Sequence, residues 1–285
     1  MTAMTLSDLI AALPGVASQH ARTTPTYTLL EKATAQAVKG SRFGQTEAAR
    51  EKLGGFGEIE LPYYKMGAVD SLDLFGLDEL IIFSLYWANR GRYRRAADIG
   101  ANLGLHSIMM ARCGWSVKAY EPDPTHAALL ERNLALNKAA TVDLVRAAVS
   151  DRAGEMEFVR VLGNTTSSHL AGAKTNPYGE LERFPVKVVA IGEIMAEVDF
   201  VKMDAEGQEK IIILGTKAEQ WEKTDMIVEV GSDENARAIY EHLAKLGVNA
   251  FAQKLGWGRV QALADMPSSY KHGSLFVTGK AQMPW

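Results

Sequence analysis

The sequence has a single cysteine, Cys113, among its 285 residues. One cysteine excludes an internal disulfide framework and any metal site of the CxxC type. Such sparse use of cysteine is typical of a reducing compartment, so we expect a cytoplasmic protein without structural zinc.

Long hydrophobic runs are also missing. The densest apolar stretch, residues 80–88, is about half as long as a segment that crosses a bilayer, and it favours a buried helix instead. No Lys or Arg precedes the short apolar segment at residues 9–13, and Asp8 abuts it. We therefore expect neither a secretory signal nor a membrane span.

Neither sign of charge dominates, because 34 acidic and 31 basic residues give a formal net charge of −3. This balance offers no global attraction to nucleic acid, and we expect no nucleic-acid partner. The one basic cluster is Arg90, Arg92, Arg94 and Arg95. It could bind a phosphate or a lipid headgroup. Its place before the first core strand favours a solvated surface at the amino edge of the sheet.

What the sequence does contain is a globular share of apolar residues, 47% beside 23% charged ones. The length favours one large domain with an extension. Residues 1–70 are rich in Ala and Thr and are predicted to form an accessory helical segment. Residues 71–285 are predicted to form the main domain.

From residue 94 onward, β-type runs alternate with helical runs, which predicts an α/β fold with a parallel sheet wrapped by helices. The predicted strands are residues 96–100, 117–120, 142–149, 156–161, 186–189, 200–203, 226–230, 248–252 and 274–278. The predicted helices are residues 105–113, 124–137, 209–214 and 235–246. A polar loop is expected at residues 163–179.

The turn after the first core strand reads Asp98-Ile-Gly100-Ala-Asn102-Leu-Gly104. Gly100 permits a tight turn, and Asn102 can replace a glycine because it tolerates left-handed backbone angles. The start of the next helix favours a carboxylate or another anion. A dinucleotide fingerprint needs a third glycine, which weakens the pyrophosphate interpretation. An ordinary strand-to-helix turn remains an alternative.

Glu121 follows the second core strand, 23 positions after Asp98. An acid at this point accepts hydrogen bonds from both ribose hydroxyls of an adenosine ligand. A glutamate after a strand is common on its own. The turn and the glutamate at this spacing together predict an adenosine-containing ligand.

Five stretches of the sequence resemble the FkbM-type family of S-adenosylmethionine-dependent methyltransferases. They are the turn at residues 98–104, the Glu-Pro-Asp-Pro at 121–124, and the segments at 129–137, 201–209 and 227–230. The resemblance covers roughly residues 72–278. It implies a Rossmann-like sheet of seven strands whose last strand, residues 274–278, is antiparallel. It also implies S-adenosylmethionine as cofactor and methyl transfer, usually to oxygen.

The resemblance also implies roles for individual residues on the cofactor side. Asp98, Gly100, Asn102 and Gly104 are expected to surround the methionine part of the cofactor, and Glu121 is expected to hold the ribose. The remaining candidates are Asp123 and Ala148 beside the adenine and Ser107 for the cofactor carboxylate.

On the acceptor side, Asp204 follows the strand at residues 200–203, at the edge where open α/β sheets place ligands. We expect it to face the transferred methyl group. The alternative is that Asp204 caps the following helix. Glu229 ends the next strand and could frame the acceptor pocket with Asp204. Two carboxylates also suit Mg²⁺, but no third ligand is evident, so we expect no metal.

His169 lies in the polar loop and is the preferred general base, because imidazole accepts protons near neutral pH. A solvated loop histidine is the alternative. For His106, a structural place at the helix start is favoured over catalysis.

The leading hypothesis is an O-methyltransferase that acts on a hydroxyl of a small molecule or a glycan. An NAD-dependent oxidoreductase and a non-catalytic cofactor-binding module are the alternatives. The first 70 residues are candidates for a lid or a homodimer contact.

Overall fold

The computed structural model describes residues 4–43, 50–67, 69–173 and 179–285, and within them eight strands form a central sheet in the order β13-β12-β14-β11-β10-β3-β4-β5. These strands are β3 (Arg95–Ile99), β4 (Ser116–Tyr120), β5 (Val142–Val145), β10 (Phe200–Met203), β11 (Asp225–Glu229), β12 (Asn249–Ala252), β13 (Gly258–Arg259) and β14 (Ser274–Thr278). β3, β4, β5, β10 and β11 pair in parallel, whereas β14 is antiparallel to both of its neighbours. The expected seven-strand order with an antiparallel last strand is confirmed, and β13 adds a short edge strand that was not predicted.

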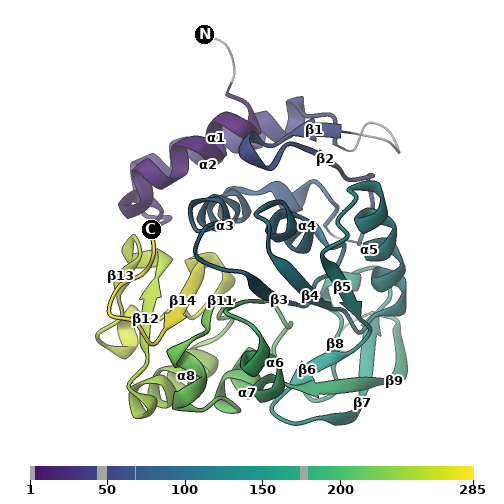
Figure 1. Ribbon diagram of the computed structural model, residues 1–285, viewed down its shortest axis with the longest axis vertical. Coiled ribbons are helices and arrows are strands. Elements are labelled where there is room, and N and C mark those ends of the chain that lie inside the picture. The colour runs from purple at the N-terminus through teal and green to yellow at the C-terminus, as the bar shows by residue number, and fades with distance from the viewer. Residues whose placement is uncertain (1–3, 44–49, 68, 174–178) are drawn as a thin grey trace.

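Helices cover both faces of this sheet (Figure 1). One face carries α3 (Leu77–Ala88), α4 (Leu105–Arg112) and α5 (Pro124–Leu136), and the other carries α6 (Ile191–Glu197), α7 (Glu209–Leu214) and α8 (Asp233–Leu246). Each face has its own hydrophobic core. Short 3-10 turns complete the chain at Leu13–Gln19, Gly54–Phe56, Asp73–Phe75, Thr165–Ser167, Ala218–Glu222, Gln253–Leu255, Leu263–Asp265 and Tyr270–His272. In the part of the chain described, no helix has the length and apolarity to cross a membrane.

The N-terminal segment packs on the outer side of α3 (Figure 1). It contains α1 (Leu6–Ala12), α2 (Pro25–Gly40) and a hairpin of β1 (Arg50–Lys52) with β2 (Glu58–Glu60) that was not predicted. Its apolar side chains share one core with α3, so α3 is covered on both sides. This explains why residues 80–88 are apolar almost throughout. The division of the chain at residue 70 stays a prediction.

A second sheet of four strands, in the order β6-β9-β7-β8, lies beside the central one. Its strands are β6 (Ala148–Ser150), β7 (Gly154–Val161), β8 (His169–Leu170) and β9 (Leu181–Ala190). The prediction of one strand over residues 142–149 was wrong. The amide of Ala147 donates to the carbonyl of Val145 at 2.8 Å, and this tight turn carries the chain from the central sheet into the second sheet. His169 lies in the short strand β8 and not in a loop as predicted. Residues 174–178 of the expected loop lie outside the described residues.

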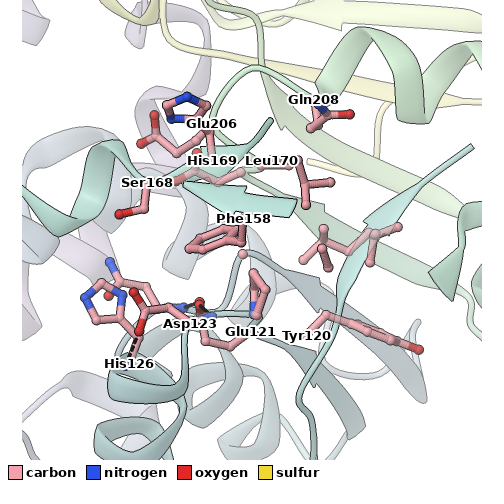
Figure 2. Close-up of a pocket in the computed structure, with 18 of the residues that line it drawn as sticks. Tyr120, Glu121, Asp123, His126, Phe158, Ser168, His169, Leu170, Glu206 and Gln208 are labelled. Carbon is pink, nitrogen blue, oxygen red and sulfur yellow. Dashed lines mark hydrogen bonds between the residues drawn. The ribbon is translucent and has the colours of Figure 1, made fainter. Parts of the chain in front are cut away.

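The second sheet faces the carboxyl end of β4 across a hollow. Figure 2 shows Phe158, His169 and Leu170 on one side of it, with Tyr120 and Glu121 on the other. The fold therefore brings two sheets together at the edge where the sequence places its site.

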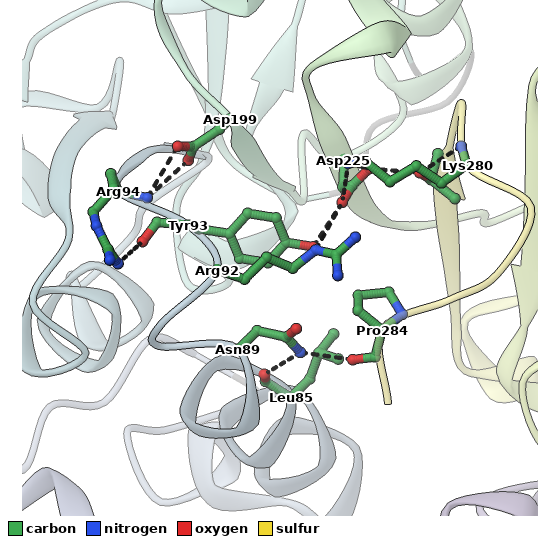
Figure 3. Close-up of polar contacts among 10 residues, drawn as sticks. Leu85, Asn89, Arg92, Tyr93, Arg94, Asp199, Asp225, Lys280 and Pro284 are labelled. Atoms are coloured by element: carbon green, nitrogen blue, oxygen red, sulfur yellow. Dashed lines mark hydrogen bonds and ion pairs between the residues drawn. The ribbon is translucent and has the colours of Figure 1, made fainter.

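At the opposite, amino edge, Asp225 holds the end of the chain against the sheet (Figure 3). Its fully buried carboxylate accepts hydrogen bonds from the Tyr93 hydroxyl at 2.8 Å, the Thr278 hydroxyl at 2.5 Å and the Lys280 ammonium at 2.9 Å. Arg92 adds an ion pair at 3.9 Å. The basic cluster thus lies at the amino edge, as expected, and part of it neutralises a buried acid.

We predict that Asp225→Asn lowers the free energy of unfolding by about 3–5 kcal/mol, because it leaves the Lys280 charge beside a buried neutral amide. Urea denaturation measures this change. The matched control is Asp233→Asn on an exposed helix start, which should lower the free energy by less than about 1 kcal/mol. Equal effects of the two substitutions would show that Asp225 is not a stabilising centre.

Candidate functional site

An open pocket lies at the carboxyl ends of β3, β4 and β10. We call it the main pocket. Of the predicted site residues, seven line it: Gly100, Asn102, Glu121, Asp123, Ala148, His169 and Asp204. Asp98, Gly104, Ser107 and Glu229 do not.

Gly100 lets the turn after β3 pass directly under the turn after β10. It has a φ of +73°, and a Cβ atom built on it would lie 1.8 Å from the carbonyl oxygen of Asp204. Asn102 has a φ of +51°, the left-handed conformation expected from the sequence. Gly104 precedes α4 with a φ of +83°, and a Cβ there would meet the side chain of Leu130 at 2.8 Å. Close packing of two turns and a helix therefore requires both glycines.

The Glu121 carboxylate ties the ends of β3 and β4 together. It accepts hydrogen bonds from the amides of Asn102 and Asp123, each at 2.8 Å. Burial raises the pKa of Glu121 to about 8, although these two hydrogen bonds oppose the rise. The carboxylate lines the main pocket and is poised to accept further donors.

Asp98 and Ser107 lie beneath the turn after β3. Both are fully buried, and the Ser107 hydroxyl donates to Asp98 at 2.6 Å. The second oxygen of Asp98 has no hydrogen bond and lies 3.9 Å from the ammonium of Lys202. These two residues support the turn from below, and their direct contact with a cofactor stays a prediction.

Asp123 joins the second sheet to the rim of the main pocket. Its carboxylate caps the start of α5 and forms a two-pronged pair with the Arg160 guanidinium at 2.7 and 2.6 Å. Burial would raise the pKa of Asp123, but the hydrogen bonds and charge of Arg160, the charge of His126 and the amide of Thr125 together outweigh it and lower the pKa. The sequence did not reveal Arg160 as a site residue. Arg160 lies on β7, and no local sequence pattern predicts that β7 packs beside the start of α5. Ala148 begins β6 and supplies part of an apolar wall with Val149.

The segment from Asp204 to Glu209 is a tight turn held by its own last residue. The Glu209 carboxylate accepts hydrogen bonds from the amides of Ala205 at 2.9 Å and Gly207 at 2.9 Å. Glu206 and Gly207 both have positive φ, at +49° and +101°. Gln208 is the residue that precedes α7, so the alternative that Asp204 caps this helix was wrong. The Asp204 carboxylate is left at the pocket, where 45% of its side chain is exposed.

A second, much smaller pocket adjoins the main one, and it has room for about one water molecule. Its polar lining consists of Glu79, Lys202, Asp204, Glu229 and Ser274. Asp204 is common to both pockets. The buried Ser274 hydroxyl has no hydrogen-bond partner. Glu229 and Asp204 thus line one small pocket beside the main one, and their role in framing the acceptor stays a prediction.

Lys202 is the cation of this second pocket. It is 8% exposed, and its ammonium lies 3.8 Å from Asp204 and 3.9 Å from Asp98. Burial alone would lower the pKa of Lys202, but the charges of Asp204 and Asp98 outweigh it and raise the pKa. Burial and the charge of Asp204 raise the pKa of Glu229 well above its usual value. The sequence offered a signal for Lys202, a charged residue inside an otherwise apolar strand.

The two candidate histidines, His169 and His106, lie in different surroundings. His169 is 2% exposed and lines the main pocket, where its Nδ1 lies 2.9 Å from the carbonyl oxygen of Ser167. It is not part of the second pocket. His106 is also buried, and its ring bridges Tyr86 and Glu79. The expectation of a structural place for His106 agrees with these contacts, and the role of His169 as a base stays a prediction.

No group of three or more His, Cys, Asp or Glu side chains with metal-binding geometry occurs among the residues that the structure describes.

The strand order, the antiparallel β14 and the ligand pocket at the carboxyl edge place this chain among the Rossmann-like methyltransferases. Its sequence matches the Methyltransferase FkbM domain over residues 98–253, more than half of the chain, so the protein belongs to the FkbM methyltransferase family. The family prediction is thereby confirmed. S-adenosylmethionine is its methyl donor, and the NAD-dependent alternative is not favoured.

Similar proteins include the methyltransferase sdnD of Sordaria araneosa, which is 28% identical over 180 residues, or 51% of this chain and 70% of that protein. Among solved structures, an O-methyltransferase from Bacillus cereus in complex with SAH has 14% identity and a TM-score of 0.39, covering 70% of this chain and 80% of that one. A SAM-dependent methyltransferase from Agrobacterium tumefaciens has 9% identity and a TM-score of 0.43, covering 82% and 71%. The family assignment does not rest on these two structures.

The residues of the main pocket fit such a cofactor. Glu121 offers a buried carboxylate for a ribose diol, and the Asn102 side chain has a buried oxygen without a hydrogen bond. The wall of Ala148, Val149 and Phe158 is apolar, as a purine face requires.

Replacement of Gly100 by Ala tests the close contact between the turn after β3 and the turn after β10. We predict that Gly100→Ala lowers both the free energy of unfolding and the affinity for S-adenosylhomocysteine, because the new methyl group overlaps the backbone of Asp204. Gly114 is the matched control: its φ is +85°, but a Cβ there meets nothing within 4 Å. Gly114→Ala should cost about 1–2 kcal/mol and leave the affinity unchanged. An affinity loss in both variants, measured by calorimetry, would contradict the role of the close passage.

The pKa of Glu121 near 8 predicts a pH dependence of cofactor binding. Ribose hydroxyls donate to the ionised carboxylate, which is the minor form below pH 8 and the major form above it. The affinity for S-adenosylhomocysteine should therefore rise by about tenfold from pH 7 to pH 9. Glu121→Gln should bind more weakly and show no such rise. A flat wild-type profile in the same calorimetric titrations would remove Glu121 from the ribose site.

Proposed function

We propose that this protein transfers a methyl group to a hydroxyl of a small molecule or a glycan, with the cofactor in the main pocket and the acceptor hydroxyl at the mouth of the second pocket. The observation that carries the proposal is that Asp204 lines both pockets. A reaction between two bound molecules needs such a shared boundary, because the reacting atoms must approach to about 3–3.5 Å.

On the cofactor side, Glu121 would hold the ribose, with Asn102 and the turn after β3 around the methionine part. Ala148 would lie against the adenine. Asp123 would act through its pair with Arg160, which fixes the second sheet at the rim. When bound, S-adenosylmethionine supplies an electrophilic methyl group on a positively charged sulfur.

On the acceptor side, the polar lining suits a hydroxyl. Asp204 can accept a hydrogen bond from the acceptor and stabilise positive charge beside it. Glu229 can donate one in its protonated form, which its raised pKa favours. The unpartnered hydroxyl of Ser274 offers another hydrogen bond. An apolar acceptor would leave these groups buried and unsatisfied, which is unfavourable.

Most of the rate acceleration in this proposal comes from alignment. The acceptor oxygen must point at the methyl carbon along the line of the bond that breaks, and a 1 Å misplacement can reduce such rates by about a hundredfold. The turn at residues 204–209 is therefore central, because the internal hydrogen bonds of Glu209 fix its shape.

A panel of acceptors tests the proposal, with radiolabelled S-adenosylmethionine as donor. The hydroxyl probes are methyl α-D-glucopyranoside, trans-cyclohexane-1,2-diol, catechol and 1-hexanol, and the competing probes are benzylamine and thiophenol. We expect label in at least one hydroxyl probe and a higher rate for it than for the amine or the thiol. Transfer to the amine or thiol alone would contradict the assignment to oxygen.

Asp204→Asn should reduce transfer to the hydroxyl probe by about a hundredfold or more, because it removes the charge at the shared boundary. The affinity for S-adenosylhomocysteine should change by less than about threefold, since the carboxylate faces the boundary and not the ribose. Loss of both binding and transfer would instead place Asp204 in the cofactor site.

A further inference from the structure

A chain of three polar side chains, two buried and the third partly exposed, ends at the second pocket. The Tyr86 hydroxyl lies 2.9 Å from Nδ1 of His106, and Nε2 of His106 lies 2.8 Å from Oε2 of Glu79. Tyr86 is fully buried and His106 is 8% exposed. A neutral imidazole has one donor and one acceptor nitrogen. In either protonation state Nε2 can donate to Glu79, because Nδ1 accepts from Tyr86 in the neutral ring and donates to it in the charged ring.

Glu79 presents its other oxygen to the second pocket. It lines that pocket together with Lys202, Asp204 and Glu229. His106 holds Oε2, and the described residues give Oε1 no hydrogen bond. Burial would raise the pKa of Glu79, but the charge and hydrogen bond of His106, together with the charge of Lys202, outweigh it and lower the pKa. Glu79 is therefore an ionised carboxylate with one oxygen open to a ligand.

The other candidates for a proton acceptor are less suited to this place. The Asp204 carboxylate lies 3.8 Å from the ammonium of Lys202 and forms an ion pair with it. Burial and the charge of Asp204 raise the pKa of Glu229 well above its usual value, so Glu229 holds a proton more readily than Glu79 does. His169 lines the main pocket and not the second one. Glu79 alone combines ionisation, a fixed position and an open oxygen.

We propose that Glu79 receives the proton of the acceptor hydroxyl, and that His106, fixed in turn by Tyr86, is the positioning residue that holds the Glu79 carboxylate toward the second pocket. This inference rests on the proposed function.

The acceptor oxygen forms a bond to the methyl carbon while the bond from that carbon to sulfur breaks, and its electron pair stays on sulfur. The hydroxyl proton passes to Oε1 of Glu79, which becomes a neutral carboxyl and later releases the proton to water. Because the pKa of an alcohol is far above that of a carboxyl, the proton moves only as the new bond forms.

The test compares two reactions of the same protein. The first is methyl transfer to the most reactive of the hydroxyl probes named above, which requires loss of a proton. The second is the reaction of S-adenosylhomocysteine with iodomethane, in which the thioether sulfur takes the methyl group and iodide leaves, so no proton moves. Calorimetric affinity for S-adenosylhomocysteine is measured for every variant.

Glu79→Gln keeps the shape of the side chain and an oxygen for His106. We expect it to slow transfer to the hydroxyl probe by a hundredfold or more, about the contribution of a general base. The iodomethane reaction and the affinity should stay within about threefold of the wild type. His106→Gln should show the same selective loss, smaller in size. The controls are Glu234→Gln and His242→Gln on α8, outside both pockets, which should leave both rates unchanged.

Three results would overturn the inference. Hydroxyl transfer by Glu79→Gln within about threefold of the wild type would show that Glu79 takes no proton. An equal loss of both reactions would show a role in alignment only. A selective loss in His169→Gln but not in Glu79→Gln would assign the proton to His169. If the wild type performs the iodomethane reaction but methylates no hydroxyl probe, the proposed function fails and the inference falls with it.

Discussion

The close passage of Gly100 beneath the carbonyl of Asp204 is the constraint on which the site depends. A single methyl group on Gly100 would lie 1.8 Å from that oxygen. The turn that contributes the cofactor wall and the turn that contributes Asp204 are therefore in direct contact, and neither can shift alone. Because proteins pack densely, this contact fixes where Asp204 stands relative to the main pocket.

The electrostatics of the site follow from one cation among several acids. Lys202 rises from β10 between Asp98 and Asp204, and its charge also acts on Glu79 and Glu229. One ammonium cannot neutralise every carboxylate around it, so the acids differ in their protonation. The interaction with His106 helps to lower the pKa of Glu79 despite its burial, whereas burial and the charge of Asp204 raise the pKa of Glu229. Such divergence allows acid and base roles within a single small pocket.

The local features of the fold could be predicted from the sequence. β10, α7 and β14 begin and end as expected, because apolar runs and turn residues mark these elements directly, whereas the antiparallel direction of β14 was implied by the resemblance to the FkbM-type family. The predicted strand at residues 142–149 failed, since a tight turn at Ala147 divides a stretch in which no Gly or Pro marks a break.

For the site, the glycines and acids of the two turns could be predicted because their backbone conformations restrict the residue type. Glu79 and Arg160 could not, since each reaches the site from an element far away in the sequence. His106 was visible, but its partners Tyr86 and Glu79 lie on α3, and only the packing of α3 on α4 brings them to its ring. Contacts between elements that are far apart in the sequence cannot be predicted from local sequence patterns.

The central claim is that the main pocket is built for S-adenosylmethionine. Calorimetric titration of the wild-type protein with S-adenosylhomocysteine, with NAD⁺ in a parallel titration, tests it most directly because no acceptor is needed. The account predicts saturable one-to-one binding of S-adenosylhomocysteine and none of NAD⁺. Binding of NAD⁺ without binding of S-adenosylhomocysteine would contradict it.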